Sequence, residues 1–213
     1  MNKNNILAIW TFRNDLPLKK ITDSEHEYTK KMSDSRAYQY IHSRGYVRHA
    51  LSKIFDENPL DIPLNALPYS PPQLPTSYGH ISFSHCNDML VVAWCMERIG
   101  VDIEREDRQI SRINNFKKLF LDDIKLLRNK KTDDNELRSQ ILDLWVIKES
   151  LIKWENSSIF NGMQNWKLSK SCNHGLNIKS GLKVKIQKIN FNKWKIGIAS
   201  NHVRNFSPLQ ICL

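Results

Sequence analysis

The chain has 213 residues, of which 40% are hydrophobic and 25% are charged, and these values are ordinary for a globular protein with a sizeable core. Glycine is scarce and there is no low-complexity tract, so collagen-like and repetitive chains are excluded. The formal net charge of +10 and the pI of about 9.5 favour a negatively charged partner, such as nucleic acid, an anionic membrane, a phosphorylated ligand or an acidic protein.

The cysteines and the apolar runs indicate the compartment. The four cysteines form no C-x-x-C pair and no zinc-binding spacing, so we expect free thiols in a reducing environment. The apolar run near the N-terminus is too short for a signal peptide, and the longest apolar stretch, 89–96, is too short to cross a bilayer. We therefore expect a soluble cytoplasmic protein that does not associate with membranes. We also expect it to be a monomer.

The first half of the chain is expected to begin with a strand and a long helix. Residues 6–12 are typical of a strand, and residues 24–55 predict a helix. In this helix Arg44 and Arg48 form an i,i+4 pair on one stripe. The proline-rich segment 67–79 that follows cannot be regular structure.

Three short strands are expected in the middle of the chain, over residues 80–85, 89–96 and 101–104. In the first of them Ile81 and Phe83 alternate with polar residues, which predicts one buried face. Because only short turns separate the three segments, we expect them to pair with one another as an antiparallel meander.

The second half is expected to repeat this order of helices followed by strands. Residues 113–129 have a helical pattern, 129–136 predict a polar loop, and 137–155 predict a second helix. Residues 182–189 and 193–200 alternate like the two strands of a hairpin. Each half therefore combines helices with a short antiparallel sheet, which predicts an α/β (α+β) fold.

The segment "GVDIE" (100–104) contains the first candidate site. In a strand, residues two apart point to the same face, so Asp102 and Glu104 share one face. Two carboxylates at that separation can hold one hard divalent cation. The alternative is an edge strand that exposes both acids to water.

The segment "WVIKESLIKW" (145–154) contains the second candidate. Its apolar residues cover most of a helix, yet Lys148, Glu149 and Lys153 lie among them. Glu149 and Lys153 share a face, and the ordinary interpretation is a surface salt bridge worth roughly 0–1 kcal/mol. The apolar flanks favour a site instead, in which Glu149 joins the two acids of the strand around Mg²⁺ and the lysines bind anionic oxygens of a substrate.

His85 is a third candidate, because it ends a strand at a turn, where functional residues are common. The alternative is a histidine whose hydrogen bonds are satisfied within its own turn. By itself this residue does not decide between the two interpretations.

Three segments, in this order and spacing, resemble the signature segments of the Sfp-type 4′-phosphopantetheinyl transferases. They are "HISFSHCNDMLVVAW" (80–94), "IGVDIE" (99–104) and "LWVIKESLIKW" (144–154). A further segment, "DSRAYQYIHSRGYVR" (34–48), resembles the arginine-punctuated helix of the same family. The resemblance covers about residues 6–166.

The resemblance implies two similar α/β halves related by a pseudo-twofold axis, residues 1–98 and 99–213, with coenzyme A in the cleft between them. It implies Mg²⁺-dependent transfer of the 4′-phosphopantetheine group from coenzyme A to a serine of an acyl or peptidyl carrier protein, with release of adenosine 3′,5′-bisphosphate. The expected partner is thus an acidic carrier protein and not nucleic acid, and the +10 charge would attract it.

Carried over by position, the resemblance makes Asp102, Glu104 and Glu149 the Mg²⁺ ligands, while Ser84 and His85 contact the phosphates of coenzyme A.

The same resemblance places Lys148 and Lys153 in a Lys-Glu-x-x-x-Lys segment, with Lys153 near the pyrophosphate. Glu149 is our choice for the group that accepts the serine proton, directly or through water, and Lys153 for the group that stabilises the leaving oxygen. Together with the metal-bound Asp102 they form the expected catalytic set.

One departure from the family concerns the loop before the Ser-His strand. The family usually has Gly-Lys-Pro there, and its lysine meets the nucleotide end of coenzyme A, whereas this chain reads "YSPPQLP" (69–75) without a lysine. The basic residues that could replace it are Arg44, Arg48, Lys30 and Lys31.

A basic segment, 111–131, follows the acidic strand and is a candidate for carrier capture, since it contains Lys117 and Lys118 beside apolar residues.

Two alternatives to a transferase are a metal-dependent nuclease and a basic nucleic-acid-binding module. Metal-dependent nucleases usually carry an acid-x-lysine motif on a strand, whereas Glu149 and Lys153 lie four residues apart on a predicted helix. A nucleic-acid-binding module is disfavoured because the chain lacks an RNA-binding aromatic signature, a zinc spacing and a convincing helix-turn-helix. Binding of coenzyme A but not of DNA at moderate salt would separate the three.

Overall fold

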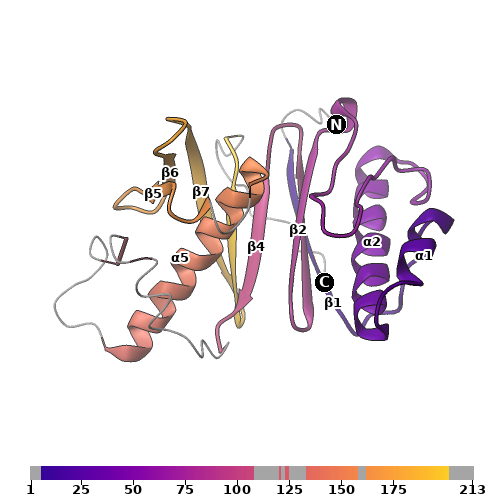
Figure 1. Ribbon diagram of the computed structural model, residues 1–213, viewed down its shortest axis with the longest axis horizontal. Coiled ribbons are helices and arrows are strands. Elements are labelled where there is room, and N and C mark those ends of the chain that lie inside the picture. The colour runs from indigo at the N-terminus through magenta and orange to yellow at the C-terminus, as the bar shows by residue number, and fades with distance from the viewer. Residues whose placement is uncertain (1–5, 108–119, 121–122, 125–132, 158–161, 202–213) are drawn as a thin grey trace. The chain divides into compact units, whose positions relative to one another are not determined.

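The computed structural model of the chain is a mixed α+β structure with two antiparallel sheets and three α-helices among its described residues (Figure 1). The structure describes residues 6–107, 120, 123–124, 133–157 and 162–201. These residues divide into two compact units at Met96 and Glu97. None of the helices described is long and apolar enough to cross a membrane. The predicted division at residue 98 into two functional halves, and their pseudo-twofold relation, stay predictions.

The first unit contains a three-stranded antiparallel sheet with two helices. Its strands are β1 (Leu7–Arg13), β2 (His80–Cys86) and β3 (Met89–Cys95), in the order β1-β3-β2. Its helices are α1 (Asp23–Thr29) and α2 (Asp34–Phe55), with one short 3₁₀ turn, η2 (Thr76–Tyr78). Every residue of the central strand β3 is buried, which explains its uninterrupted apolar sequence.

The single helix predicted over residues 24–55 is wrong, because the structure has two helices there. Thr22 and Glu25 form a capping box that starts α1, and α1 ends at Thr29. Ser33 then adopts an extended conformation as the N-cap of α2. The helical residue pattern continues across this break, so the pattern alone did not reveal it.

The prediction that β2 buries only one face is also wrong. Ile81 is buried as expected, but Ser82 and Ser84 on the other face are only 5% and 8% exposed. Serine is small and can lie in a buried position when its hydroxyl is satisfied, so polarity alone did not identify the exposed face.

The second unit contains a five-stranded antiparallel sheet and one long helix. The strands are β4 (Gly100–Arg105), β5 (Trp166–Leu168), β6 (His174–Asn177), β7 (Lys183–Phe191) and β8 (Trp194–Ala199), in the order β4-β8-β7-β6-β5. The helix α5 (Asp134–Glu155) packs against β4, β8 and β7 of this sheet (Figure 1). The predicted hairpin of β7 and β8 is confirmed, with Ile189 opposite Ile196.

The predicted meander of three strands is wrong at its last member. β2 and β3 pair as expected, but β4 pairs with β8 of the second sheet, with Val101 opposite Ile198. The partner of β4 therefore comes from the far end of the chain. Short turns favour pairing between neighbours in sequence, and this long-range partner could not be identified from local pattern.

The helix α5 begins three residues earlier than predicted. Asp133 is its N-cap, and its Oδ1 atom accepts a hydrogen bond of 2.8 Å from the backbone N–H of Glu136. The polar stretch that suggested a loop thus includes a helix start. Most of the helix predicted over 113–129 lies outside the described residues. The part that is described includes Phe120 and Ile124, which are buried in the core.

Two glycines allow α5 to lie directly on the sheet. A Cβ atom added at Gly100 would overlap the carbonyl oxygen of Ser150, and one at Gly197 would overlap that of Val146. Gly197 is the ladder partner of Asp102, and Gly100 precedes Asp102 by two residues on the same face. The close approach of helix and sheet therefore lies where the acidic residues of β4 begin.

We expect Gly197→Ala to destabilise the protein by about 3 kcal/mol or more, because the new methyl group overlaps helix backbone that cannot rotate away. Urea unfolding followed by circular dichroism measures this change. Gly181→Ala is the matched control: no atom lies within 4 Å of its added Cβ, and only its left-handed φ of 72° opposes the change, at about 1 kcal/mol. Equal losses for the two variants would contradict the close approach.

Candidate active site

The candidate site is organised around an ion pair between α5 and β4. Lys153 Nζ lies 2.7 Å from Asp102 Oδ1. The Asp102 residue is only 5% exposed, whereas the Lys153 side chain is 29% exposed. A buried carboxylate is costly unless it is paired, so the contact with Lys153 offsets part of the cost of burying Asp102.

The other two predicted carboxylates lie on the same two elements. Glu104 follows Asp102 on the helix-facing side of β4 and is 8% exposed. Glu149 lies one turn before Lys153 on α5 and is 7% exposed. Within the part of the chain that the structure describes, no three His, Cys, Asp or Glu side chains are gathered closely enough to hold a metal ion. The structure thus brings Asp102 to Lys153 and places both glutamates on the same pair of elements.

Lys195 is a charged neighbour that the sequence analysis missed. It lies directly opposite Glu104 in the β4–β8 ladder and is only 4% exposed. Its Nζ atom donates hydrogen bonds of 2.7 Å to Ser139 Oγ and Asp143 Oδ1, both on α5. The small residues at alternate positions, Gly197 and Ala199, mark this side of β8 as the helix-facing one, and that alternation was the available signal.

Lys148 has structural contacts. Its Nζ atom lies 2.6 Å from Asp123 Oδ2, donates to the Met163 carbonyl oxygen at 3.2 Å and lies 5.3 Å from the centre of the Phe120 ring. The Lys148 residue is only 3% exposed. These contacts attach Phe120, Asp123 and Met163 to α5. The predicted contact of Lys148 with a coenzyme A phosphate stays a prediction.

Arg44 and Arg48 are also held by neighbouring protein groups. Arg48 donates to both carboxylate oxygens of Glu25 at 2.9–3.2 Å and to the Ile62 carbonyl oxygen at 2.7 Å. Arg44 donates twice to the Ala66 carbonyl oxygen, at 3.2 and 2.8 Å, and burial lowers the pKa of its guanidinium. Both arginines join α2 to the loops after it, and their predicted phosphate contacts are untested.

The remaining candidates lie in the first unit. Ser84 is buried and His85 half-buried on β2, opposite Val91 and Leu90 of β3. Lys30 and Lys31 are exposed, and Lys30 forms a 2.6 Å ion pair with Glu27. The segment 111–131, predicted to capture the carrier, lies outside the described residues except for Phe120 and the pair 123–124.

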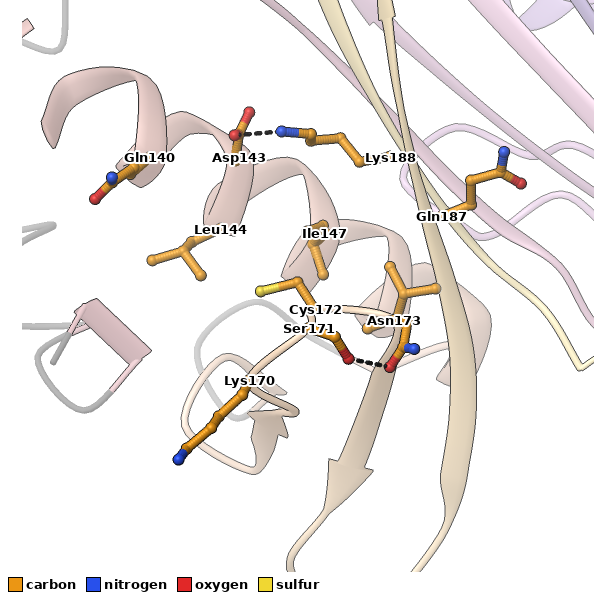
Figure 2. A pocket seen from close by; sticks show the side chains of 11 residues that line it. Gln140, Asp143, Leu144, Ile147, Lys170, Ser171, Cys172, Asn173, Gln187 and Lys188 are labelled. Carbon is orange, nitrogen blue, oxygen red and sulfur yellow. Dashed lines mark hydrogen bonds and ion pairs between the residues drawn. The ribbon is translucent and has the colours of Figure 1, made fainter. Parts of the chain in front are cut away.

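A pocket of about 460 Å³ lies elsewhere in the second unit, between the first half of α5, β7 and the turn before β6 (Figure 2). Figure 2 shows Asp143 reaching Lys188 of β7 across its rim, and their ion pair is 2.5 Å long. Cys172, which also lines the pocket, is half-buried, and burial raises the pKa of its thiol. None of the predicted site residues lines this pocket.

The second unit corresponds to a known family. The family model described as "4′-phosphopantetheinyl transferase superfamily" matches residues 98–204, half of the chain. The chain belongs to the 4′-phosphopantetheinyl transferase superfamily. It is therefore an enzyme of the 4′-phosphopantetheinyl transferase class, whose members transfer phosphopantetheine to carrier proteins. No curated protein matches the chain.

The match includes the whole α5–β4 arrangement of this phosphopantetheinyl transferase. Asp102, Glu104, Glu149 and Lys153 all lie inside it, whereas Ser84 and His85 precede it. Membership of the superfamily is thus supported by residues of the second unit. The resemblance to the Sfp type rests on the motifs in the sequence.

The structural role of Lys148 in the transferase can be measured. We expect Lys148→Met to lower the free energy of unfolding by about 3–5 kcal/mol, because it leaves the Asp123 carboxylate buried and unpaired. The double variant Lys148→Met with Asp123→Leu should recover much of this loss, because both charges are then removed. Denaturant unfolding of the single and double variants gives the coupling, and equal instability of the two would contradict a buried ion pair.

Proposed function

We propose that this protein is an Sfp-type enzyme that transfers the 4′-phosphopantetheine group of coenzyme A to a serine of an apo acyl or peptidyl carrier protein, and releases adenosine 3′,5′-bisphosphate. The observation that carries this proposal is the Asp102–Lys153 ion pair, which lies in the family-matched region with Glu104 and Glu149 on the same two elements. Phosphoryl transfer depends mainly on positioning and charge neutralisation, and these residues supply both signs of charge at one place.

The donor groups suit a hard divalent cation by their chemistry, although their side chains are not gathered closely enough in this structure to hold one. Asp102, Glu104 and Glu149 provide carboxylate oxygens, the ligand type that Mg²⁺ prefers, and Asp102 already holds a cationic group, the Lys153 ammonium, at 2.7 Å. We assign these three residues as the Mg²⁺ ligands. When bound, Mg²⁺ would act as a Lewis acid on the pyrophosphate and a template for its orientation.

The chain's own residues then have separate tasks. Glu149 accepts the proton of the carrier serine, directly or through water. The serine oxygen forms a bond to the phosphorus that carries the pantetheine, and the bond from this phosphorus to the bridging oxygen breaks. Lys153 donates a hydrogen bond to the departing oxygen of adenosine 3′,5′-bisphosphate and stabilises its charge.

The first unit is proposed to supply Ser84 and His85 as contacts for the coenzyme A phosphates. Lys148, Arg44, Arg48, Lys30 and Lys31 are the other basic candidates. Lys30 and Lys31 are exposed, whereas the other three are buried among structural contacts, so we favour the exposed pair for the 3′-phosphate. We propose a cytoplasmic monomer with a transient acidic carrier partner. A nuclease or nucleic-acid-binding module is disfavoured, because the acidic residues lie inside the transferase match.

Replacement of one proposed ligand tests the proposal. Asp102→Asn keeps the shape and a hydrogen-bond acceptor for Lys153 but removes the charge, and we expect transfer from coenzyme A to fall by about 100-fold or more. Mass spectrometry of an apo-carrier incubated with coenzyme A and Mg²⁺ measures the product. The matched control is Asp143→Asn, another α5-associated acid paired with lysines, which should change transfer only a few-fold. Near-normal transfer by Asp102→Asn would overturn the metal assignment.

The net charge of +10 gives a second test of the partner. We expect association with an acidic carrier to slow by about tenfold as ionic strength rises tenfold, because salt screens long-range attraction. Stopped-flow association rates at several salt concentrations measure this dependence. A rate that stays flat from low to high salt would show that the positive charge does not serve carrier capture.

A further inference from the structure

We propose that one end of the second sheet, around the turn from β6 to β7, binds the surface of an anionic lipid membrane. The expectation of no membrane association came from the absence of a spanning segment, and a surface contact needs none. This inference concerns a part of the protein outside the candidate active site and does not depend on the proposed function. The hairpin surface, as we call it, consists of Lys167, Leu176, Ile178, Lys179, Leu182 and Lys183.

Three aliphatic side chains of the hairpin surface are exposed to solvent. Leu176 is 46% exposed, Ile178 is 55% exposed and Leu182 is 45% exposed. Among the described residues of the second unit, no other large hydrophobic side chain is exposed to this degree. Single exposed apolar residues are common, but several gathered at one turn indicate a contact surface.

The same end of the sheet is basic. Residues 156–213, which include β5 to β8, contain no Asp or Glu. In the strand ladders Leu176 lies between Lys167 of β5 and Lys183 of β7, so the three side chains share one face of the sheet. Both lysines are exposed, and β5 and β6 form the edge of the sheet farthest from β4 (Figure 1). An apolar side chain is thus flanked by positive charge on both sides.

The positive potential of this face acts on His174, which lies opposite Lys185 in the β6–β7 ladder. Desolvation and the charges of Lys183 and Lys185 lower the pKa of its imidazole. The histidine therefore stays neutral at neutral pH, and the charge of the face comes from its lysines. A face with this potential attracts anionic groups.

The turn between β6 and β7 is held in place and projects from the sheet. Asn177 Oδ1 accepts hydrogen bonds of 3.0 and 3.1 Å from the backbone N–H groups of Lys179 and Ser180. Asn177 Nδ2 donates to Glu155 Oε1 of α5 at 2.8 Å, which ties the turn to the helix. A Cβ atom added at Gly181 meets no atom within 4 Å, so this side of the turn faces open space. The turn therefore needs little ordering when it binds.

The combination of aliphatic side chains with lysines favours lipid over other anionic partners. Protein interfaces are enriched in aromatic residues and arginine and depleted of lysine. Nucleic acid would bind the lysines, but bases stack on aromatic side chains, and none of the described aromatic residues of the second unit is exposed. A second copy of the chain is disfavoured because two basic faces repel each other. An anionic membrane accepts both groups, the ammonium at lipid phosphates and the aliphatic side chains in the interface.

Co-sedimentation of the whole protein with lipid vesicles tests the inference. We expect binding to be about tenfold tighter, or more, to phosphatidylcholine vesicles with about 30% phosphatidylglycerol than to pure phosphatidylcholine vesicles, because each lysine near an anionic surface adds about fivefold. Replacing Lys179 and Lys183 together by glutamine should weaken binding to the anionic vesicles by about 20-fold. Replacing Ile178 and Leu182 together by serine should weaken it by about tenfold. All four side chains are exposed, so both variants should keep the wild-type melting temperature within a few degrees.

Matched control variants in the first unit separate the hairpin surface from the net charge. Lys20→Gln with Lys53→Gln also removes two exposed lysines, and Leu18→Ser with Leu67→Ser removes two aliphatic side chains that are 44% and 41% exposed. Each control should bind the anionic vesicles within about threefold of the wild type, because none of these residues belongs to the hairpin surface.

Equal weakening by the hairpin variants and their controls would overturn the inference, since net charge alone would then attract the protein. A wild type that does not bind the anionic vesicles would overturn it as well. If such a protein instead bound an acidic apo-carrier, and the hairpin variants weakened that binding, the hairpin surface would belong to a protein partner.

Discussion

The close packing of α5 on β4 and β8 is the constraint on which the rest of the second unit depends. It exists because Gly100 and Gly197 have no side chain where the carbonyl oxygens of Ser150 and Val146 pass. With the helix this close, the acids on the same side of β4 become buried, and each charge needs a partner within the unit. The positions of Asp102 and Lys153 follow from this contact between backbones.

Two lysines of α5, Lys148 and Lys153, have the same side chain but differ in burial and in contacts. Lys148 is buried, where the Asp123 carboxylate and the Met163 carbonyl oxygen hold it, and it joins these two residues to the helix. Lys153 lies on another side of the same helix, half-exposed, with its ammonium on a buried acid. Burial and the number of contacts therefore distinguish Lys148, which is held on several sides, from Lys153, which has one printed partner and a partly exposed side chain.

The two units differ in what their buried charges do. In the first unit Arg44 and Arg48 bind mostly backbone carbonyl oxygens and one capping glutamate, so they fasten loops to α2. In the second unit the buried charges face one another between helix and sheet. The family match falls on the second unit, where the buried acids of β4 and the lysines of α5 and β8 lie.

The sequence by itself determined the composition class, most strands, the helix that carries Glu149 and Lys153, and the acids of β4, because alternation, helical spacing and short motifs are local properties. It could not reveal that β4 pairs with β8, that a break divides α1 from α2, or that Lys148 meets Asp123. Those features depend on which distant segments meet. Only the tertiary structure decided them. A charged residue has the same place in a sequence motif whether its partner is a substrate or a buried acid, so the motif alone does not identify the partner.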